Sequence, residues 1–159
     1  LTEFGLLWLE EPIAADRPIS EWQAVKQAAS MLIAAGENIH GEDNYGEILQ
    51  NDILDVVQPD IAKWGGLSKT IQLARRVIDT KKLYCPHYLG GGIGLVASAH
   101  ALAAAGGEGM LEVDINPNPL RSELVGNLLN LKSGMAKLGN DPGLGIEPDL
   151  KPLSRYQVL

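Results

Sequence analysis

Short apolar runs recur along the first 115 residues, and each run ends at an ionisable side chain. The ionisable residues that close the runs lie 27, 23, 27 and 25 residues apart: Glu10, Glu37, Asp60, His87 and Glu112. A step of that length fits one strand, one helix and their loops. Buried strands that alternate with helices are typical of a parallel sheet. The pattern therefore predicts consecutive βα units in an α/β fold.

The segments between the runs have the apolar periodicity of helices. We expect helices over residues 19–29, 45–50, 68–79 and 94–105. Ser20 and Ser68 are the expected N-caps of the first and third helices. The third helix is expected to bury one stripe of side chains: Leu67, Ile71, Ala74 and Ile78. After residue 115 the alternation stops, and the Gly- and Pro-rich remainder predicts a helix, a few short strands and loops.

Charge and composition exclude several classes of protein. The net charge is −7, with 13 Lys and Arg against 20 Asp and Glu, which argues against a nucleic acid or an anionic membrane as partner. The most apolar stretch, residues 90–107, is rich in Gly and Ala and suits a packed helix better than a membrane span. Cys85 is the only cysteine, so we expect no internal disulfide and a cytoplasmic location.

The five ionisable residues are expected to meet at one edge of the sheet. In a (β/α)₈ barrel the carboxyl ends of the strands form the catalytic face. Glu10 and Glu37 would offer oxygen ligands of the kind that Mg²⁺ prefers, and the cation would relieve their mutual repulsion. His87 can exchange a proton near neutral pH, with Asp60 orienting its ring. Together with Glu112, the set predicts metal-assisted removal of a proton next to a carboxylate.

Several motifs spread over nearly the whole chain are more specific in combination than alone. They are Trp8-Leu9-Glu10-Glu11-Pro12, Gly36-Glu37-Asn38, Gln58-Pro59-Asp60-Ile61-Ala62-Lys63-Trp64-Gly65-Gly66, Pro86-His87 and Pro142-Gly143-Leu144-Gly145-Ile146. Together they resemble the enolase superfamily, mandelate racemase subgroup. The resemblance implies a modified TIM barrel of the (β/α)₇β type, in which residues 1–115 would supply strands four to eight. Residues 116–159 would form a C-terminal segment that packs on the barrel and joins the capping domain.

The resemblance also implies a role for each site residue, with Mg²⁺ as cofactor and an enediolate intermediate. Glu10 is similar to the second metal ligand and Glu37 to the third. Asp60 and His87 match the Asp–His dyad, and Glu112 matches the acid that hydrogen-bonds the substrate carboxylate. Muconate-cycloisomerase-like relatives have a Lys where Asp60 stands, and Lys63 lies three residues too late to replace it.

The first metal ligand and a Lys-x-Lys base motif of the family would lie before Leu1. The chain also begins without an initiator Met. We therefore expect a truncated chain, with negligible activity and weak metal binding when it is isolated.

Simpler interpretations stand beside these roles. Glu10 and Glu37 could be solvated loop acids or helix-capping carboxylates, and His87 could be a core histidine. Three further residues are candidates for substrate binding: His40, Lys63 and Arg121. His40 lies just past a strand end, where it could contact substrate or have no role in the site. Lys63 is expected at the rim of the site, with no assigned role. Arg121 could bind a carboxylate or equally be a surface residue.

The leading hypothesis is the C-terminal catalytic part of an enzyme that dehydrates a sugar acid, either an aldonate or an aldarate. Polar residues near the predicted mouth of the site suit a polyol: Asn38, His40, Asn116, Asn118 and Arg121. A racemase or epimerase of a 2-hydroxy acid is the alternative within enzymes, and an inactive truncated half-barrel is the alternative outside them. The full-length protein is expected to form a homo-oligomer.

Overall fold

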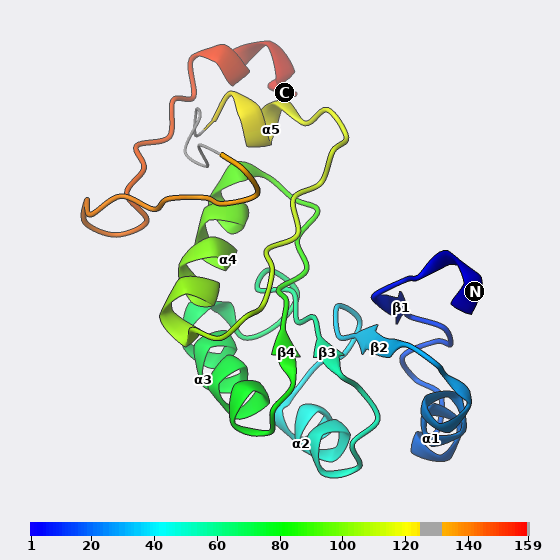
Figure 1. Cartoon of the computed structure of the whole chain (residues 1–159). Helices are drawn as coiled ribbons and strands as arrows, with labels where there is room; N and C mark the ends of the chain where they lie inside the picture. The colour runs from blue at the N-terminus through cyan, green and yellow to red at the C-terminus, as the bar shows by residue number, and fades with distance from the viewer. Residues whose placement is uncertain (125–131, 159) are drawn as a thin grey trace.

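Four short parallel strands form the sheet in the computed structural model, which describes residues 1–124 and 132–158. The strands are Trp8–Glu10 (β1), Leu32–Ala35 (β2), Val56–Val57 (β3) and Leu83–Tyr84 (β4). They pair in chain order, with Leu9 opposite Ile33 and Val57 opposite Tyr84. Figure 1 shows the strands at the centre of the molecule. The predicted α/β class with a parallel sheet is confirmed.

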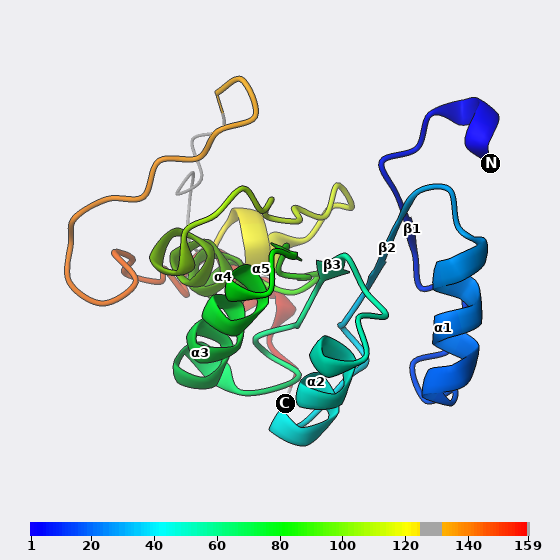
Figure 2. The ribbon, with the colours of Figure 1, turned by 60° about the horizontal axis from the view of Figure 1, so that its bottom comes forward.

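A helix follows each strand. These helices are Ile19–Ala28 (α1), Glu42–Gln50 (α2), Gly66–Asp79 (α3) and Gly92–Ala105 (α4). Figure 2 shows α1, α2 and α3 along one side of the strands, and α4 lies against α3. Parallel strands require such crossover connections, because the chain must return to the same end of the sheet before each new strand begins.

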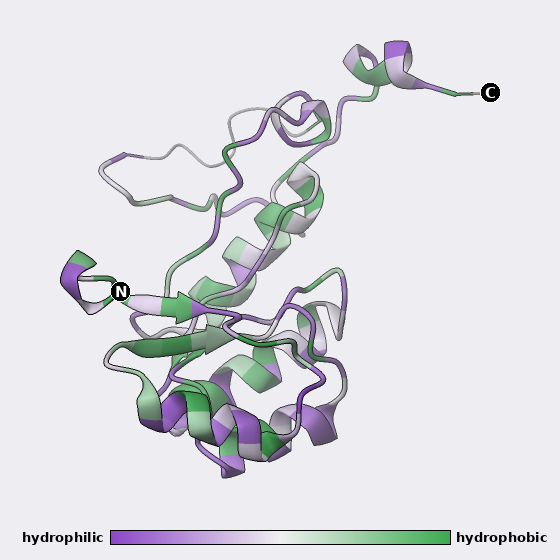
Figure 3. Cartoon of the chain, turned by 90° about the vertical axis from the view of Figure 1, so that its right-hand side faces the viewer, coloured by the Kyte–Doolittle hydropathy of each residue, from purple (hydrophilic) through white to green (hydrophobic). Residues whose placement is uncertain are grey.

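Side chains that alternate along the strands build two separate parts of the core. Ile33, Ala35 and Val57 point toward the helices and pack with a cluster that includes Trp22 and Leu73. On the opposite face, three buried side chains form a second cluster: Ala34, Val56 and Cys85. Figure 3 shows apolar strands beside helices that have both apolar and polar sides. Because both faces of the sheet are buried, the strands read as continuous apolar runs in the sequence.

Three of the four helices begin two or three residues earlier than predicted, at Glu42, Gly66 and Gly92, whereas α1 begins at Ile19 as predicted. Ser20 and Ser68 are not the N-caps, because α1 begins after Pro18 and α3 begins after Gly65. Gly65 has φ of 83°, a left-handed conformation that glycine adopts without steric cost. The expected cap at each serine is therefore wrong, although the helices themselves are present.

The buried stripe of α3 is rotated from the predicted one. Thr70, Leu73, Ala74 and Val77 are buried, whereas Leu67 is 38% exposed. The rotation has a physical cause, since α3 packs both on the sheet and on α4 and must bury two neighbouring sides. A single stripe read from periodicity cannot anticipate the second contact.

The predicted fifth strand, at residues 110–111, is not a regular strand. This segment does lie beside β4, because Met110 N–H donates to Cys85 Sγ at 3.3 Å and Glu112 N–H donates to Pro86 O at 3.4 Å. Within residues 1–124 and 132–158, no strand pairs with the side of this segment that faces away from β4. A segment held by so few bonds keeps the position of a strand without forming a ladder.

The residues after 115 form a sparse tail over α4. They include a short helix, Pro119–Ser122 (α5), and a 3₁₀ helix, Pro152–Tyr156. His100 Nε2 lies 3.2 Å from Leu144 O, which joins the tail to α4. In the described part of the tail the expected strands are reduced to one isolated bridge, between Lys132 and Met135. The division of the chain at residue 115 stays a prediction.

Among the described residues, no helix is both long enough and apolar enough to cross a membrane.

Candidate active site

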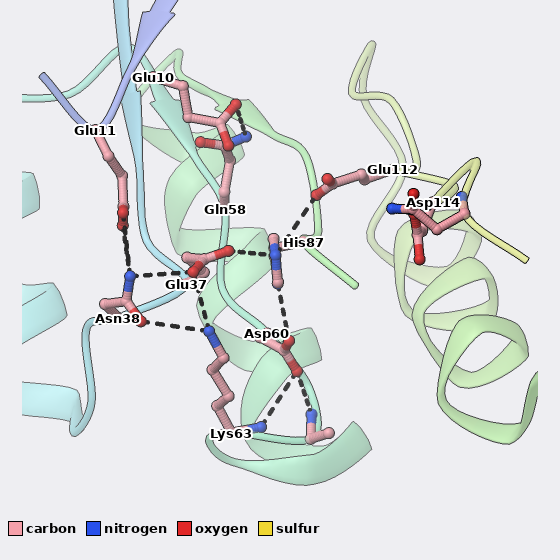
Figure 4. Close-up of polar contacts among 12 residues, drawn as sticks. Glu10, Glu11, Glu37, Asn38, Gln58, Asp60, Lys63, His87, Glu112 and Asp114 are labelled. Atoms are coloured by element: carbon pink, nitrogen blue, oxygen red, sulfur yellow. Dashed lines mark hydrogen bonds and ion pairs between the residues drawn. The ribbon is translucent and has the colours of Figure 1, made fainter. Parts of the chain in front are cut away.

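The ionisable residues that close the apolar runs come together at the carboxyl ends of the strands, as Figure 4 shows. Glu10 ends β1. Glu37, Asp60 and His87 each follow a strand within three residues, and Glu112 lies in the segment beside β4. The gathering follows from topology, because parallel strands end at the same edge of the sheet.

His87 and Asp60 form a buried pair. His87 Nδ1 lies 2.8 Å from Asp60 Oδ2, and the two residues are only 4% and 5% exposed. Asp60 Oδ1 accepts backbone N–H groups of Ala62 at 2.7 Å and of Lys63 at 3.2 Å. These two bonds fix the carboxylate, so that its other oxygen orients the imidazole ring. The ring in turn directs Nε2 toward the remaining acids.

The second nitrogen of His87 faces two carboxylates. Nε2 contacts Glu37 Oε2 directly and lies 4.0 Å from Glu112 Oε2. The Glu37 and Glu112 side chains are 23% and 37% exposed, whereas that of His87 is 5% exposed. A buried imidazole therefore presents Nε2 to the more open part of the site, a geometry that is compatible with general acid–base catalysis.

Donors from β1 and from the segments that follow β2 and β3 hold Glu10 and Glu37. Glu10 accepts from Gln58 Nε2 at 2.9 Å and from Trp8 Nε1 at 3.3 Å. Glu37 accepts from Asn38 Nδ2 at 3.0 Å and from Lys63 Nζ at 3.1 Å. Lys63 thus lies in the site, at its exposed rim, where it partly balances the negative charge.

Carboxylates from neighbouring strands suit a hard divalent cation in chemistry and placement. Glu10 ends β1 and Glu37 follows β2, and these two strands pair directly. Across residues 1–124 and 132–158, however, no three His, Cys, Asp or Glu side chains are arranged to hold a metal ion. The two glutamates therefore fit part of a metal site, and their role as Mg²⁺ ligands stays a prediction.

Glu112 carries an unsatisfied oxygen. Oε2 is buried and has no hydrogen-bond partner among residues 1–124 and 132–158. Burial raises the pKa of the Glu112 carboxyl, and the negative charges of Glu10 and Glu37 raise it further, while His87 opposes the change. A carboxyl that retains its proton can donate a hydrogen bond to an anionic group in the site.

Replacing Glu112 by Gln is expected to change how stability depends on pH. A carboxyl whose pKa is raised in the folded state binds its proton more tightly when folded, so wild-type stability falls as pH rises above the ordinary value of 4.5. The Gln variant lacks this loss, and its advantage in melting temperature should grow through that window and vanish in acid. The difference in melting temperature is measured by thermal unfolding of the metal-free proteins from about pH 4 to 8, a range that includes the titration of ordinary and raised carboxyl groups.

The exposed Glu147 offers a control, because Glu147→Gln changes the same chemical group outside the site. No pH-dependent gap is expected for that variant. A Glu112→Gln advantage that shrinks as pH rises would contradict the assignment.

The structure does not bring His40 and Arg121 to this cluster. His40 is exposed and lines a cavity of about 400 Å³ together with Trp22, Ile48 and Asn38, so that only Asn38 is shared with the cluster. Arg121 is held by Asp114, at 3.0 Å, and by the backbone oxygen of Asn116. Their predicted contacts with substrate therefore stay predictions without geometric support.

Sequence reasoning overlooked Gln58. Its side chain is 5% exposed and its amide reaches Glu10. The signal was present, because Gln58 lies two residues before Asp60 and alternation places both on the same side of the strand.

Comparisons with known proteins agree with this architecture. The family profile described as enolase C-terminal domain-like matches residues 1–152. The D-galactarolactone cycloisomerase of Agrobacterium fabrum is 26% identical over 163 residues, covering 98% of this chain and 43% of that enzyme. The arabinonate dehydratase of Saccharolobus solfataricus is 27% identical over 145 residues, covering 91% of this chain and 38% of that enzyme.

A crystal structure gives the same result in three dimensions. The mandelate racemase/muconate lactonizing enzyme from Bordetella bronchiseptica RB50 matches with a TM-score of 0.91 and 51% identity, covering 96% of this chain and 43% of that one. The chain thus spans about two fifths of the length of these relatives. With its strand-end acids, its buried Asp–His pair and the profile match over nearly its full length, the chain belongs to the C-terminal, barrel-forming part of the enolase superfamily, in the mandelate racemase group.

Proposed function

We propose that this chain is the catalytic part of a Mg²⁺-dependent enzyme that removes the proton next to the carboxylate of a sugar acid and dehydrates it. The observation that carries the proposal is the buried Asp60–His87 pair, whose Nε2 faces Glu37 and Glu112. The names of the relatives, an arabinonate dehydratase and a galactarolactone cycloisomerase, support a sugar acid as substrate.

Each residue would have one part in the reaction. His87 Nε2 would take the α-proton, while Asp60 holds the ring and stabilises its positive charge. Glu112, with its raised pKa, would donate a hydrogen bond to the substrate carboxylate. Glu10 and Glu37 would hold Mg²⁺, which when bound supplies positive charge to the carboxylate as negative charge develops there.

Dehydration then needs the β-hydroxyl to leave with a proton. His87, protonated by the first step, could return that proton to the departing oxygen, so that the substrate loses one water and no external acid is consumed. The resulting enol becomes a 2-keto-3-deoxy acid. In the alternative, racemisation, the proton would return to the other face of the same carbon and no water would leave.

A substrate panel tests the proposal. The complete protein with Mg²⁺ is incubated with aldonic and aldaric acids, and 2-keto-3-deoxy products are measured with semicarbazide. We expect keto-acid release from at least one sugar acid, and loss of that release with a chelator. Racemisation without keto-acid release, or turnover that persists without divalent metal, would contradict the proposal.

Other parts of the proposal concern the molecule as a whole. We propose a cytoplasmic homo-oligomer that binds a small carboxylate rather than a nucleic acid or a membrane. The net charge of −7 supports the exclusion of nucleic acid and anionic membrane, and the free, buried Cys85 supports the location. For the isolated chain we propose weak Mg²⁺ binding and negligible activity, because the described residues supply only part of a metal site.

A further inference from the structure

Each of the two predicted metal-ligating carboxylates accepts a hydrogen bond from a side-chain amide. Gln58 Nε2 donates to Glu10 Oε2 at 2.9 Å, and Asn38 Nδ2 donates to Glu37 Oε1 at 3.0 Å. Figure 4 shows Gln58 next to Glu10, and Asn38 next to Glu11 and Glu37. The sequence motifs assign no role to Gln58, and the sequence predicts Asn38 only as a polar residue near the mouth of the site.

The Gln58 side chain reaches Glu10 across a neighbouring strand. Gln58 follows β3, whereas Glu10 ends β1, and β2 lies between them. The backbone of Gln58 lies against Gly36, just past the end of β2, where a Cβ atom would be 2.6 Å from Gln58 N and C. Because Gly36 has no side chain, β2 and β3 approach closely there. With 5% of the residue exposed, the Gln58 amide has little freedom to point elsewhere.

Asn38 is oriented by three neighbours. Its Nδ2 donates to both oxygens of Glu11, at 3.0 and 3.1 Å, as well as to Glu37. Its Oδ1 accepts from Lys63 Nζ at 3.3 Å. Glu11 itself has φ of 41°, a left-handed conformation that is uncommon outside glycine and is often retained at functional sites. With both ends of the Asn38 amide bonded, its N–H direction toward Glu37 is set.

Amide donors act differently from charged donors. Gln and Asn orient a carboxylate without adding a charge, whereas a Lys or Arg also neutralises it. Glu37 has a donor of each kind, because Lys63 Nζ lies 3.1 Å from the same Oε1 that accepts from Asn38 and balances part of its charge. Such outer partners govern the geometry and affinity of metal ligands. We propose that Gln58 and Asn38 are the positioning residues that direct the carboxylates of Glu10 and Glu37 toward a shared divalent cation. The cation in this inference rests on the proposed function.

Three variants of the complete protein test the inference. Gln58→Met and Asn38→Leu keep the approximate side-chain size but remove the donor. Asn44→Leu is the matched control, because Asn44 is exposed and donates only to the backbone oxygen of His40. In Mg²⁺ titrations by calorimetry, the two positioning variants are each expected to bind about 10–100-fold more weakly than wild type, and the control is expected to bind normally.

A metal-free measurement separates this inference from the proposed function. Glu37 contacts His87 Nε2, so a change in Glu37 orientation should shift the imidazole ¹⁵N signal of His87. Asn38→Leu is expected to shift that signal, whereas Gln58→Met and Asn44→Leu are expected to leave it in place. Because Asn38 is exposed, its variant should fold even if the buried Gln58 variant does not.

The outcomes are distinct. Wild-type Mg²⁺ affinity in Gln58→Met and Asn38→Leu, or an equal loss in Asn44→Leu, would overturn the inference. If the wild-type protein binds no Mg²⁺, the proposed Mg²⁺ dependence is refuted, and the ¹⁵N signal of His87 alone tests whether Asn38 positions Glu37. An unchanged signal in Asn38→Leu would then overturn the positioning role.

Discussion

Replacing His87 by Asn is expected to lower kcat of the complete enzyme by roughly 10²–10⁴-fold, the usual contribution of a general base. Asn is close to His in size and can still donate to Asp60, so the fold should survive while the proton-exchanging nitrogen is lost. Initial-rate kinetics on the substrate found in the panel would measure the effect. A larger loss in kcat than change in KM is expected, because the removed interaction belongs to the transition state.

A second histidine provides the control for this prediction. His100 lies in α4 and bonds the backbone oxygen of Leu144, outside the acidic cluster. His100→Asn is expected to leave kcat near that of wild type. If His87→Asn retains kcat within about twofold, less than the smallest effect expected of a general base, His87 is not the base.

The geometry explains why the expected effect is large. Asp60 is held by two backbone N–H groups, and His87 is held by Asp60, so the reactive nitrogen is oriented before any substrate binds. Preorganised groups lose little entropy in the reaction. A histidine on a flexible surface loop would not supply the same rate enhancement.

Replacing Gly36 by Ala is expected to destabilise the protein by about 3 kcal/mol, at the upper end of overpacking effects. The added Cβ would lie 2.6 Å from Gln58 N and C and 2.9 Å from Gln58 O, which are backbone atoms that cannot rotate away. The φ of 153° adds strain for any residue with a side chain. Calorimetric unfolding should show a melting temperature lower by about 10 °C for a protein of this size or somewhat larger.

The effect of Gly36→Ala should extend to the site. Relief of the clash requires Gln58 to move, and Gln58 donates to Glu10. We therefore expect weaker Mg²⁺ binding in the same variant. Tyr45, whose hydroxyl donates to Gly36 O at 3.0 Å inside the core, limits movement of Gly36 in the other direction.

Another glycine serves as the control for stability. Gly46 lies within α2, and its Cβ would meet only the end of the flexible Arg76 side chain, at 3.5 Å. Gly46→Ala is expected to be neutral or stabilising by up to about 1 kcal/mol, because Ala favours a helix more than Gly does. Equal stability of Gly36→Ala and wild type would show that β2 and β3 are not packed as closely as described.

Much of the candidate site could be anticipated because its members lie at strand ends. The regular spacing from Glu10 to Glu112 reflects repeated βα units, and parallel strands bring their ends to one edge whatever the details of packing. The same logic placed Lys63 only at the rim and left the position of His40 open, since loop residues just past a strand can turn toward the site or toward the helices. His40 turned toward the cavity that Trp22 also lines.

Features that depend on contacts with segments distant in the sequence could not be predicted from periodicity and spacing. The α3 stripe rotated because α4 packs against it, and residues 110–111 lie beside β4 without becoming a regular strand. The early start of α3 depends on the left-handed backbone of Gly65 rather than on a capping serine. In each case the deciding partner is distant in the sequence or lies in the backbone geometry.

The amino-acid sequence by itself determined the order of strands and helices and the identity of the ionisable residues at the strand ends, because these follow from local periodicity and spacing. Only the tertiary structure decided which atoms of those residues meet. Gln58 reaches Glu10 across β2, and Glu37 meets His87 from a non-adjacent strand. Such contacts depend on how closely neighbouring segments approach, and the missing side chain of Gly36 leaves room there for the backbone of Gln58.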